Sequence, residues 1–294
     1  MALRFRVRDH LRPADKTQYA VEWCAVCGYG RVDGAFTPAE VSAFYAEGYY
    51  THEEPTPVSG ASQLLDRVRM HLAWRRDRGQ DLSPDEVARS CEHPVLCDVG
   101  CGAGPALKLF RQSGYEVVGV EPDAAARKVA SVHGEVFAGT AEALPDEVAG
   151  RQFDVVLLSH VLEHCIDPLA ALANVRRLLK PGGTLIVEVP NNAAKGFALY
   201  GPGWFFTDVP RHLHFFTPAS LGKALALTGL KLERTFYTGY TRQFGQEWLA
   251  AQQKIHRAAG IEGWNPSPWT LLAKTVFAPD AEKYNSIRVH CVHA

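Results

Sequence analysis

The chain has 294 residues, which is enough for one large or two modest domains with a buried core. Its 31 basic and 32 acidic side chains nearly cancel, which leaves a formal charge of −1. The chain as a whole therefore has no positive potential that would attract nucleic acid or an anionic membrane, and we expect a small-molecule substrate. Seven cysteines without a disulfide pattern, no apolar signal core and no apolar run near the ~20 residues of a spanning helix predict a cytoplasmic protein. We expect it to be a monomer or a homodimer.

The first 60 residues are expected to form an N-terminal extension. Residues 3–8 alternate apolar side chains with arginine, the period-two pattern of a half-exposed strand. A C-x-x-C knuckle follows at Cys24 and Cys27, and residues 38–48 predict a short amphipathic helix. Since no second cysteine pair lies near the knuckle, a four-cysteine zinc site cannot close from these two alone. Two free thiols, or a zinc completed by His10, another histidine or a partner chain, remain open.

Between this extension and the next strand the sequence predicts a linker and two helices. Residues 52–60 are rich in proline and acids, which indicates a linker or lid. Residues 63–78 predict a helix with one apolar face, expected to be buried, that consists of Leu64, Leu65, Val68 and Leu72. The arginines of this helix suit a solvated face, with recognition of an acidic or phosphorylated substrate carrier as the alternative. Ser83-Pro-Asp-Glu86 is a capping signature for one more short helix.

The most informative stretch is Pro94-Val-Leu-Cys-Asp-Val-Gly-Cys-Gly-Ala-Gly104, an apolar strand that enters a glycine-rich turn and opens a helix at Pro105. Such a turn lets the backbone approach a ligand, and the N–H groups of the helix face that ligand. The spacing is G-x-G-x-G and not the G-x-G-x-x-G of dinucleotide-binding proteins. Asp98 at the strand end suits a cationic ligand group better than a pyrophosphate. S-adenosylmethionine (SAM), which carries a sulfonium and an ammonium but no phosphate, fits both features.

Further strands and polar side chains follow in regular order. Four more buried strands are predicted at residues 115–121, 135–140, 153–160 and 184–190. The second strand ends in Glu121, where ribose hydroxyls are expected in a doubly wound sheet. The third leads into a turn whose acid, Glu142, could accept a hydrogen bond from the adenine amino group. Because ligands of open parallel sheets bind beyond the carboxyl ends of strands, these acids and His160 are expected at one edge.

Together these motifs resemble those of the class I SAM-dependent methyltransferases. D-x-G-C-G-x-G, V-G-V-E-P, A-E-x-L-P, H-V-L-E-H-x-x-D-P and L-K-P-G-G stand in the family's order within residues 94–240. The resemblance implies an α/β, Rossmann-like fold with a seven-stranded, mostly parallel sheet whose last strand is antiparallel. It also implies SAM as cofactor and S-adenosylhomocysteine as product, with cofactor contacts from Asp98, Gly100, Cys101, Gly102, Gly104, Glu121, Pro122, Ala141, Glu142, Ser159 and His160.

The same resemblance suggests how the chain is divided. Residues 61–240 are expected to form the SAM-binding core, preceded by residues 1–60, where several bacterial members have a zinc ribbon with two knuckles instead of one. Pro210-Arg-His-Leu-His-Phe-Phe-Thr-Pro218 is similar to a segment that lies over the substrate cavity in related methyltransferases. Residues 241–283 are expected to be a helical insertion that either caps an apolar substrate or packs as core. Residues 284–294 supply the last strand.

Candidate catalytic groups follow the fourth strand. Methyl transfer to a hydroxyl requires alignment, desolvation and removal of a proton. His160, Glu163 and His164 would share one face if this turn is helical, and a histidine beside a carboxylate is suited to act as base. We expect His164 or His160 as the base, with His212 as the third candidate and a structural role for His164 as the alternative. Some quinone-pathway members hold a divalent metal at E-x-x-E-H; with His160 in place of the first acid, a metal is possible here but not favoured.

The acceptor is the least determined part of the prediction. Enzymes that methylate the amines of bases usually carry [DNS]-P-P-[YFW] after the fourth strand, where this chain has Ser159-His-Val-Leu162, so a nucleobase is disfavoured. The histidine-rich and aromatic-rich segments suit O-methylation of a phenol, enol, sugar or related metabolite, as in quinone-pathway and natural-product members. C- or N-methylation, SAM binding without catalysis, and another SAM-dependent reaction such as a cyclisation remain alternatives.

Overall fold

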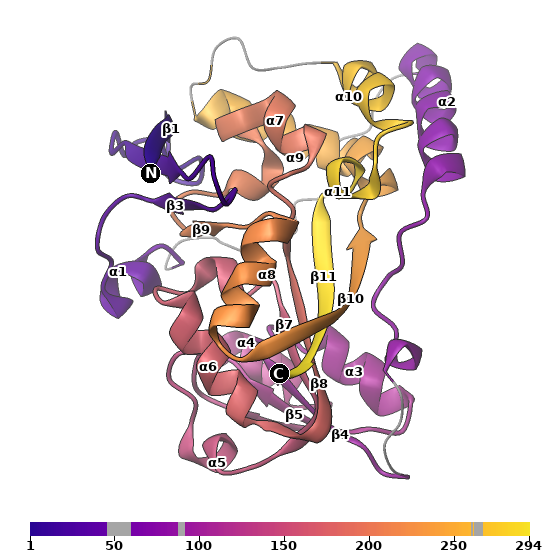
Figure 1. The fold of residues 1–294 in the computed structure, drawn as a ribbon. Coiled ribbons are helices and arrows are strands. Elements are labelled where there is room, and N and C mark those ends of the chain that lie inside the picture. The colour runs from indigo at the N-terminus through magenta and orange to yellow at the C-terminus, as the bar shows by residue number, and fades with distance from the viewer. Residues whose placement is uncertain (46–59, 88–91, 260, 262–266) are drawn as a thin grey trace. The chain divides into compact units, whose positions relative to one another are not determined.

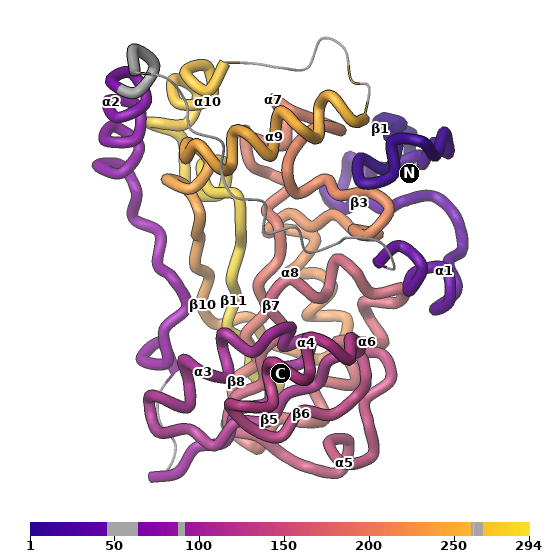
Figure 2. The backbone as a smooth tube through the Cα atoms, turned by 180° about the vertical axis from the view of Figure 1, so that it is seen from behind, coloured from indigo at the N-terminus to yellow at the C-terminus, as the bar shows by residue number. Residues whose placement is uncertain are grey.

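The fold was analysed in a computed structural model that describes the chain except residues 46–59, 88–91, 260 and 262–266 (Figure 1 and Figure 2). The chain forms two compact units. We call Gln80–Val189, Ala219–Phe236 and Ile287–Ala294 the sheet unit, and Met1–Gly79, Pro190–Pro218 and Tyr237–Ser286 the composite unit. The composite unit thus combines segments that the sequence analysis assigned to the extension, the core and the insertion.

The sheet unit is organised around a seven-stranded sheet in the order β10-β11-β8-β7-β4-β5-β6. Neighbours among β4 to β8 are parallel, and β11 runs against its neighbours (Figure 1). This confirms the predicted Rossmann-like class I methyltransferase fold. The strands are β4 (Val95–Val99), β5 (Glu116–Val120), β6 (Glu135–Phe137), β7 (Phe153–Ser159), β8 (Leu179–Pro190), β10 (Leu230–Thr238) and β11 (Ser286–His293).

Helices cover this sheet because their apolar faces match its apolar strands. Leu107 and Phe110 of α3 are fully buried against Leu96 and Val155, and burying such side chains contributes about 1.5–3 kcal/mol each. Asp167 starts α6 by accepting hydrogen bonds from two backbone N–H groups of its first turn. The helices are η1 (Pro84–Glu86), α3 (Pro105–Gln112), α4 (Ala124–Ala130), α5 (Asp146–Ala149), η2 (Leu162–His164), α6 (Pro168–Arg177) and α8 (Pro218–Leu227). The predicted capping box of Ser83 and Glu86 is present at η1.

The composite unit contains a second, antiparallel sheet in the order β1-β2-β3-β9. The alternation in residues 3–8 correctly predicted the first of its strands, in which Val7 is buried and Leu3 exposed. The fourth strand comes from a remote part of the chain, because β9 lies within the segment 210–218. The strands are β1 (Ala2–Val7), β2 (Tyr19–Trp23), β3 (Gly30–Val32) and β9 (His214–Phe215).

An aromatic core holds the rest of the composite unit together. Phe197, Tyr200 and Trp204 pack with Tyr240, Phe244, Leu271 and Leu272 in one buried cluster. The described part of residues 241–283 is mostly helical, and this packing favours the core interpretation of its apolar side chains. Trp264 lies outside the described residues. The helices are α1 (Pro38–Ala43), α2 (Gly60–Arg76), α7 (Lys195–Tyr200), η3 (Gly201–Gly203), η4 (Phe205–Thr207), η5 (Thr241–Phe244), α9 (Gln246–Ala258), α10 (Pro268–Thr275) and α11 (Asp280–Lys283).

The predicted buried face of α2 is wrong. Leu64 and Leu65 are 68% and 58% exposed, and Val68 and Leu72 are also exposed. The helix packs through its opposite side, where Ala73 is buried and Arg69 donates to the Phe244 carbonyl and pairs with Asp66. An apolar stripe shows which residues share a helix face but not which neighbour covers that face. The linker or lid predicted at residues 52–60 lies outside the described residues, apart from Gly60 at the start of α2.

None of the helices in the described part of the chain combines the length and the apolar character needed to cross a bilayer.

Candidate functional site

The glycine-rich turn between β4 and α3 is a tight cradle. Gly100, Gly102 and Gly104 have φ of 82°, 53° and 83°, a backbone conformation that favours glycine. A Cβ on Gly100 would lie 2.4 Å from Val161 Cγ2, so this glycine is required for packing. A Cβ on Gly102 would meet nothing within 4 Å, so the backbone there is open to close approach by a ligand.

Two predicted acids lie at this cradle. Glu121 accepts hydrogen bonds from Gly102 N and Asp123 N, each at 2.9 Å, and so braces the turn in a way that the sequence did not reveal. Asp98 is 3% exposed, and burial followed by the charge of Glu121 raises the pKa of Asp98 to about 7. A cationic ligand would favour the ionised form of Asp98. The cradle therefore fits the sulfonium and ammonium of SAM.

A third predicted segment, the turn at Ala141 and Glu142, is fastened to α6. Glu142 Oε1 accepts from Asp167 N at 2.7 Å, and Asn174 Nδ2 donates to the carbonyls of Ala141 and Glu142 at 3.0 and 2.9 Å. Sequence reasoning missed Asn174, which is a brace for this turn. The carbonyl of Pro122 accepts from an arginine of α4.

Buried Cys101 offers the cradle its backbone rather than its thiol. Its N–H donates to Val120 O at 3.1 Å, beside Gly100 N at 2.7 Å. Burial, followed by the charges of Asp98 and Glu121, raises the pKa of the thiol well above its usual range. A contact of the Cys101 main chain with the methionine part of SAM stays a prediction.

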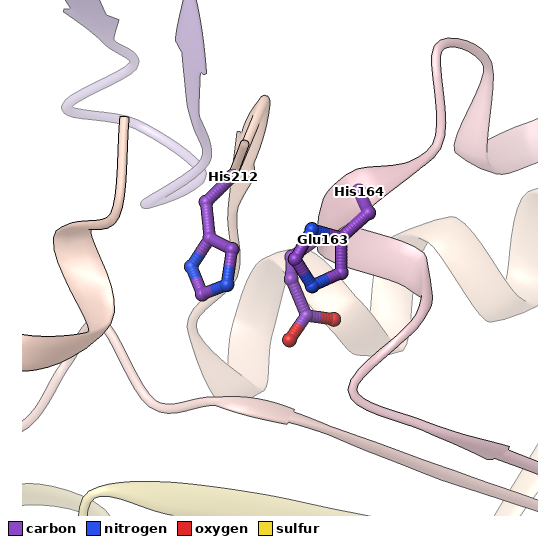
Figure 3. A group of neighbouring side chains, drawn as sticks. All are labelled: Glu163, His164 and His212. Carbon is purple, nitrogen blue, oxygen red and sulfur yellow. The ribbon is translucent and has the colours of Figure 1, made fainter. Parts of the chain in front are cut away.

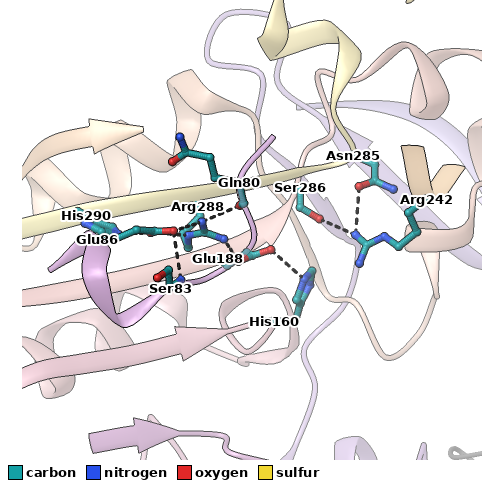
Figure 4. A network of polar contacts seen from close by, with 10 residues as sticks. All are labelled: Gln80, Ser83, Glu86, His160, Glu188, Arg242, Asn285, Ser286, Arg288 and His290. Carbon is teal, nitrogen blue, oxygen red and sulfur yellow. Dashed lines mark hydrogen bonds and ion pairs between the residues drawn. The ribbon is translucent and has the colours of Figure 1, made fainter. Parts of the chain in front are cut away.

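His160, directly after β7, is held by two carboxylates, of which Figure 4 shows Glu188. Its Nδ1 lies 3.2 Å from Glu163 Oε1, its Nε2 lies 3.7 Å from Glu188 Oε1, and its backbone takes φ of 55°, unusual outside glycine. Burial opposes protonation of the imidazole, but the hydrogen bonds and charges of Glu163 and Glu188 outweigh burial and raise the pKa of His160 to about 9. Near neutral pH the ring is therefore an imidazolium. Ser159 pairs with Glu188 across β7 and β8.

The charge on His160 belongs to a larger network in the sheet unit (Figure 4). Arg288, 1% exposed, donates to Glu188 at 3.1 Å and to Glu86 at 2.6 Å, and His290 contacts Glu86 at 3.2 Å. Although burial raises it, the pKa of Glu188 falls to about 2 because His160 and Arg288 stabilise the carboxylate. Sequence reasoning missed this network. A signal was present, because Glu188 and Arg288 are charged residues between apolar neighbours in predicted strands, and buried charges are usually paired.

His160, the first member of the metal set suggested by the resemblance, is poorly placed to bind a metal. A metal-bound imidazole must present a lone pair, yet both ring nitrogens of His160 face carboxylates, which is the contact pattern of an imidazolium. Glu163 and His164 lie on η2 (Figure 3). The His164 backbone N–H donates to Val161 O at 3.0 Å, and its side chain is half-buried. We derive no chemistry through a metal at these residues.

His212, the third predicted base, belongs to the composite unit and is drawn in Figure 3. Its Nδ1 lies 2.8 Å from the Phe206 carbonyl oxygen, and its backbone N–H donates to Asp208 O at 2.9 Å. Because a carbonyl oxygen can only accept, Nδ1 of His212 carries a proton in this contact.

The C-x-x-C knuckle forms the turn between β2 and β3. Cys24 and Cys27 are partly exposed, and Gly28 N donates to Cys24 O at 2.9 Å. Hydrogen bonds from the backbone and thiol of Cys27 lower the pKa of the Cys24 thiol. Since no second cysteine pair lies near this turn in the sequence, a zinc here would still require a histidine or a partner chain.

Comparison with known proteins agrees with this fold and cradle. A family model described as a methyltransferase domain matches residues 64–235, more than half of the chain. The chain is 37% identical over 215 residues to a ubiquinone biosynthesis O-methyltransferase of Cereibacter sphaeroides, a match that covers 66% of this chain and 82% of the relative. It is 33% identical over 211 residues to the ubiquinone biosynthesis O-methyltransferase of Ruegeria pomeroyi, again covering 66% of this chain and 82% of the relative.

Proposed function

Because the chain belongs to the methyltransferase domain family, we propose that it is an enzyme that transfers the methyl group of SAM to a hydroxyl oxygen of a small molecule. The observation that carries this proposal is the acid-lined glycine cradle. It combines an approachable backbone at Gly102 with two buried acids, Asp98 and Glu121. The negative charge of this pair would not attract a neutral or anionic nucleotide, whereas the positive charge of a sulfonium ligand would balance it.

The sheet unit supplies the groups that would hold SAM. The backbone at Gly100, Cys101, Gly102 and Gly104 forms the cradle, and Asp98 offers a carboxylate beside it. Glu121, which already orders the turn, retains acceptor capacity for ribose hydroxyls, since a carboxylate has about four acceptor positions. Pro122 continues this segment, and the turn at Ala141 and Glu142, with Ser159 and His160 at the end of β7, would border the adenine and the reactive end.

When bound, SAM supplies an electrophilic methyl carbon on a sulfonium that leaves as a neutral thioether. The protein has to align the acceptor, exclude water and receive the hydroxyl proton. One of His164, His160 and His212 would take that proton on a ring nitrogen while the O–C bond forms and the C–S bond breaks. His160 is the weakest of the three in this role, because its two carboxylate partners favour the protonated ring. As an imidazolium it would instead contribute fixed positive charge.

The names of the relatives support one acceptor class. Those named above are ubiquinone biosynthesis O-methyltransferases, so a phenolic hydroxyl on a quinone precursor or a similar aromatic metabolite is the acceptor we favour. We further propose that the enzyme works in the cytoplasm as a monomer or homodimer, without nucleic acid, membrane or metal.

The test is a screen of phenolic, enolic and sugar acceptors with the purified protein and SAM. We expect formation of S-adenosylhomocysteine and a product that gains one CH2, with the methyl on oxygen by NMR. SAM binding without turnover of any acceptor would favour a binding protein. A product of unchanged mass would favour another SAM-dependent reaction, and a methyl on carbon or nitrogen would favour the C- or N-methyltransferase alternatives.

A further inference from the structure

The turn at Ala141 and Glu142 lies at the same edge of the sheet as the glycine cradle, within the sheet unit. Val99, Val120 and Phe137 are register partners at the ends of β4, β5 and β6, so these parallel strands end side by side. The cradle directly follows β4, and the turn comes shortly after β6. Because ligands of open parallel sheets bind beyond such ends, the turn is placed to contact the ligand of the cradle.

Helix α6 holds this turn at two points. Asp167, which begins the helix, donates its backbone N–H to Glu142 Oε1 at 2.7 Å. Asn174 donates from Nδ2 to the carbonyl oxygens of Ala141 and Glu142 at 3.0 and 2.9 Å. Residues seven positions apart lie on one face of a helix, so the same face of α6 supplies both contacts. The helix is itself anchored to the sheet unit by its buried apolar residues.

The hydrogen-bond partners of Asn174 determine how its amide is oriented. Only the NH2 group can donate to two carbonyls, and Asn174 Oδ1 accepts from Arg177 Nη2 at 2.7 Å. Aspartate at this position would place an oxygen against the two carbonyls, and leucine would leave them without a donor. The turn is also closed within itself, since Ala143 N donates to Thr140 Oγ1 and Thr140 N to Ala143 O, each at 3.1 Å.

The fixed carbonyl of Ala141 sets the direction of the next N–H group. In a trans peptide the C=O and the N–H point in opposite directions, so the Glu142 N–H points away from Asn174. This N–H forms no hydrogen bond with the described part of the chain. The Glu142 carboxylate, held at one oxygen by Asp167, keeps acceptor capacity at the other. Glu142 thus combines a fixed donor with a fixed acceptor.

A donor beside an acceptor matches the Watson–Crick edge of adenine, which presents ring N1 as acceptor and the N6 amino group as donor. Hypoxanthine has an oxygen in place of the amino group and a proton on N1, so it presents the reverse pattern. We propose that Asn174 is a positioning residue that, through the peptide between Ala141 and Glu142, makes the site selective for adenine over hypoxanthine. This inference rests on the proposed function, which supplies SAM as the ligand.

The first test compares by calorimetry the binding of S-adenosylhomocysteine with that of S-inosylhomocysteine, in which hypoxanthine replaces adenine. The wild type should prefer adenine by about 100-fold, because hypoxanthine leaves the donor and the acceptor of Glu142 unpaired. Asn174→Leu should bind the adenosyl ligand about 10-fold more weakly and the inosyl ligand within about 3-fold of the wild type. Asn174→Asp, which keeps the size of the side chain and its acceptor for Arg177, should reduce the preference as well.

Thr228→Val is the matched control. Thr228 Oγ1 donates to the carbonyls of Ala224 and Leu225 at 3.1 and 2.9 Å, at the end of α8 in the same unit. The variant therefore also removes a donor shared by two neighbouring carbonyls, but far from β6 in the sequence. It should keep the full preference for adenine. Urea denaturation of the three variants shows whether their stabilities match.

A second measurement uses the wild type alone and so does not depend on how the variants fold. In ¹⁵N-labelled protein, the Glu142 amide proton should shift downfield when S-adenosylhomocysteine binds, because the N–H then donates to the base, and should shift less with S-inosylhomocysteine.

Three results would overturn the inference and leave the methyltransferase function intact. They are a wild type that binds both ligands equally, an Asn174→Leu variant that weakens both ligands by the same factor or neither, and a Glu142 amide that does not respond to the adenosyl ligand. Equal weakening would show that Asn174 is only a structural brace. A folded wild type that binds neither ligand would contradict the proposed function as well.

Discussion

The two units differ in how their functional groups come together. In the sheet unit, the residues at the cradle lie within one continuous segment, Gln80–Val189, and each follows a strand of a regular sheet. In the composite unit, His212 lies in a loop whose shape depends on Asp9 and Gly28, far away in the sequence. Motifs of fixed spacing therefore describe the first unit well and the second one poorly.

Each unit contains a buried arginine that forms ion pairs with two acids. Arg288 joins Glu86 and Glu188 in the sheet unit, and Arg211 joins Asp9 and Asp208 in the composite unit. In the sheet unit, Glu188 lies 3.7 Å from His160, a candidate catalytic histidine. In the composite unit, Asp208 precedes His212, another candidate, by four residues. The two networks differ in their effect on the histidine. The carboxylates of the first favour the protonated ring of His160, and the second fixes the backbone beside His212.

The largest effect is expected from removing these arginines. Arg288→Met or Arg211→Met leaves two buried carboxylates without their cation, which costs about 3–5 kcal/mol of unfolding free energy. Urea denaturation measures this, and if the units unfold separately, each variant should lower the stability of its own unit. As a control, Arg151→Met removes an exposed pair with Glu135, 39% and 67% exposed, and should cost less than about 1 kcal/mol. Equal small losses in all three variants would contradict the role of buried pairing.

A smaller effect is expected at the cradle. Gly100→Ala adds a Cβ that collides with Val161 in addition to a φ of 82°, so it should cost about 2–4 kcal/mol and abolish SAM binding. Gly114→Ala is the matched control, because its φ is 86° but its Cβ would meet nothing within 4 Å. It should cost only about 1–2 kcal/mol, with SAM affinity unchanged. Calorimetry and denaturation separate the two; equal behaviour would mean that the close packing on Val161 is unimportant.

A pH-dependent effect is expected from His160. Because its pKa is raised to about 9 in the folded protein, the stability it contributes is fully present below pH 6.5 and is lost as the pH rises through 9. His160→Asn, which tolerates the positive φ, should be less stable than the wild type by about 1–3 kcal/mol at pH 6 and nearly equal at pH 10. Denaturation at both pH values checks this. A difference that does not depend on pH would show that His160 is not held as an imidazolium.

Much of the fold could be predicted because the relevant signals are local. The glycine spacing at 100, 102 and 104, the acids at strand ends and the apolar runs of β4, β5 and β7 are properties of short windows, and the sheet order then follows from the family. The positions of Asp98 and Glu121 beside the cradle could be predicted in the same way.

The rest depends on contacts between distant residues. Asn174 braces the turn at 141–142 from the next helix, and Arg288 pairs with Glu188 a hundred positions earlier. The apolar stripe of α2 gave the right helix but the wrong buried side, because its neighbours come from residues 241–275. No spacing rule links Asp9 to Arg211 either. Only the three-dimensional arrangement shows that the N-terminal extension contacts the loop of His212.

The central claim, that the acid-lined cradle binds SAM, is tested most directly by calorimetric titration of SAM at pH 6 and pH 8 in buffers of different ionisation enthalpy. Since the pKa of Asp98 is about 7 without ligand, binding of the cation at pH 6 must release a proton. Affinity should therefore rise roughly 10-fold from pH 6 to pH 8, with proton release at the lower pH. Folded protein that does not bind SAM, or binds it with the same affinity and no proton release at both pH values, would contradict the account.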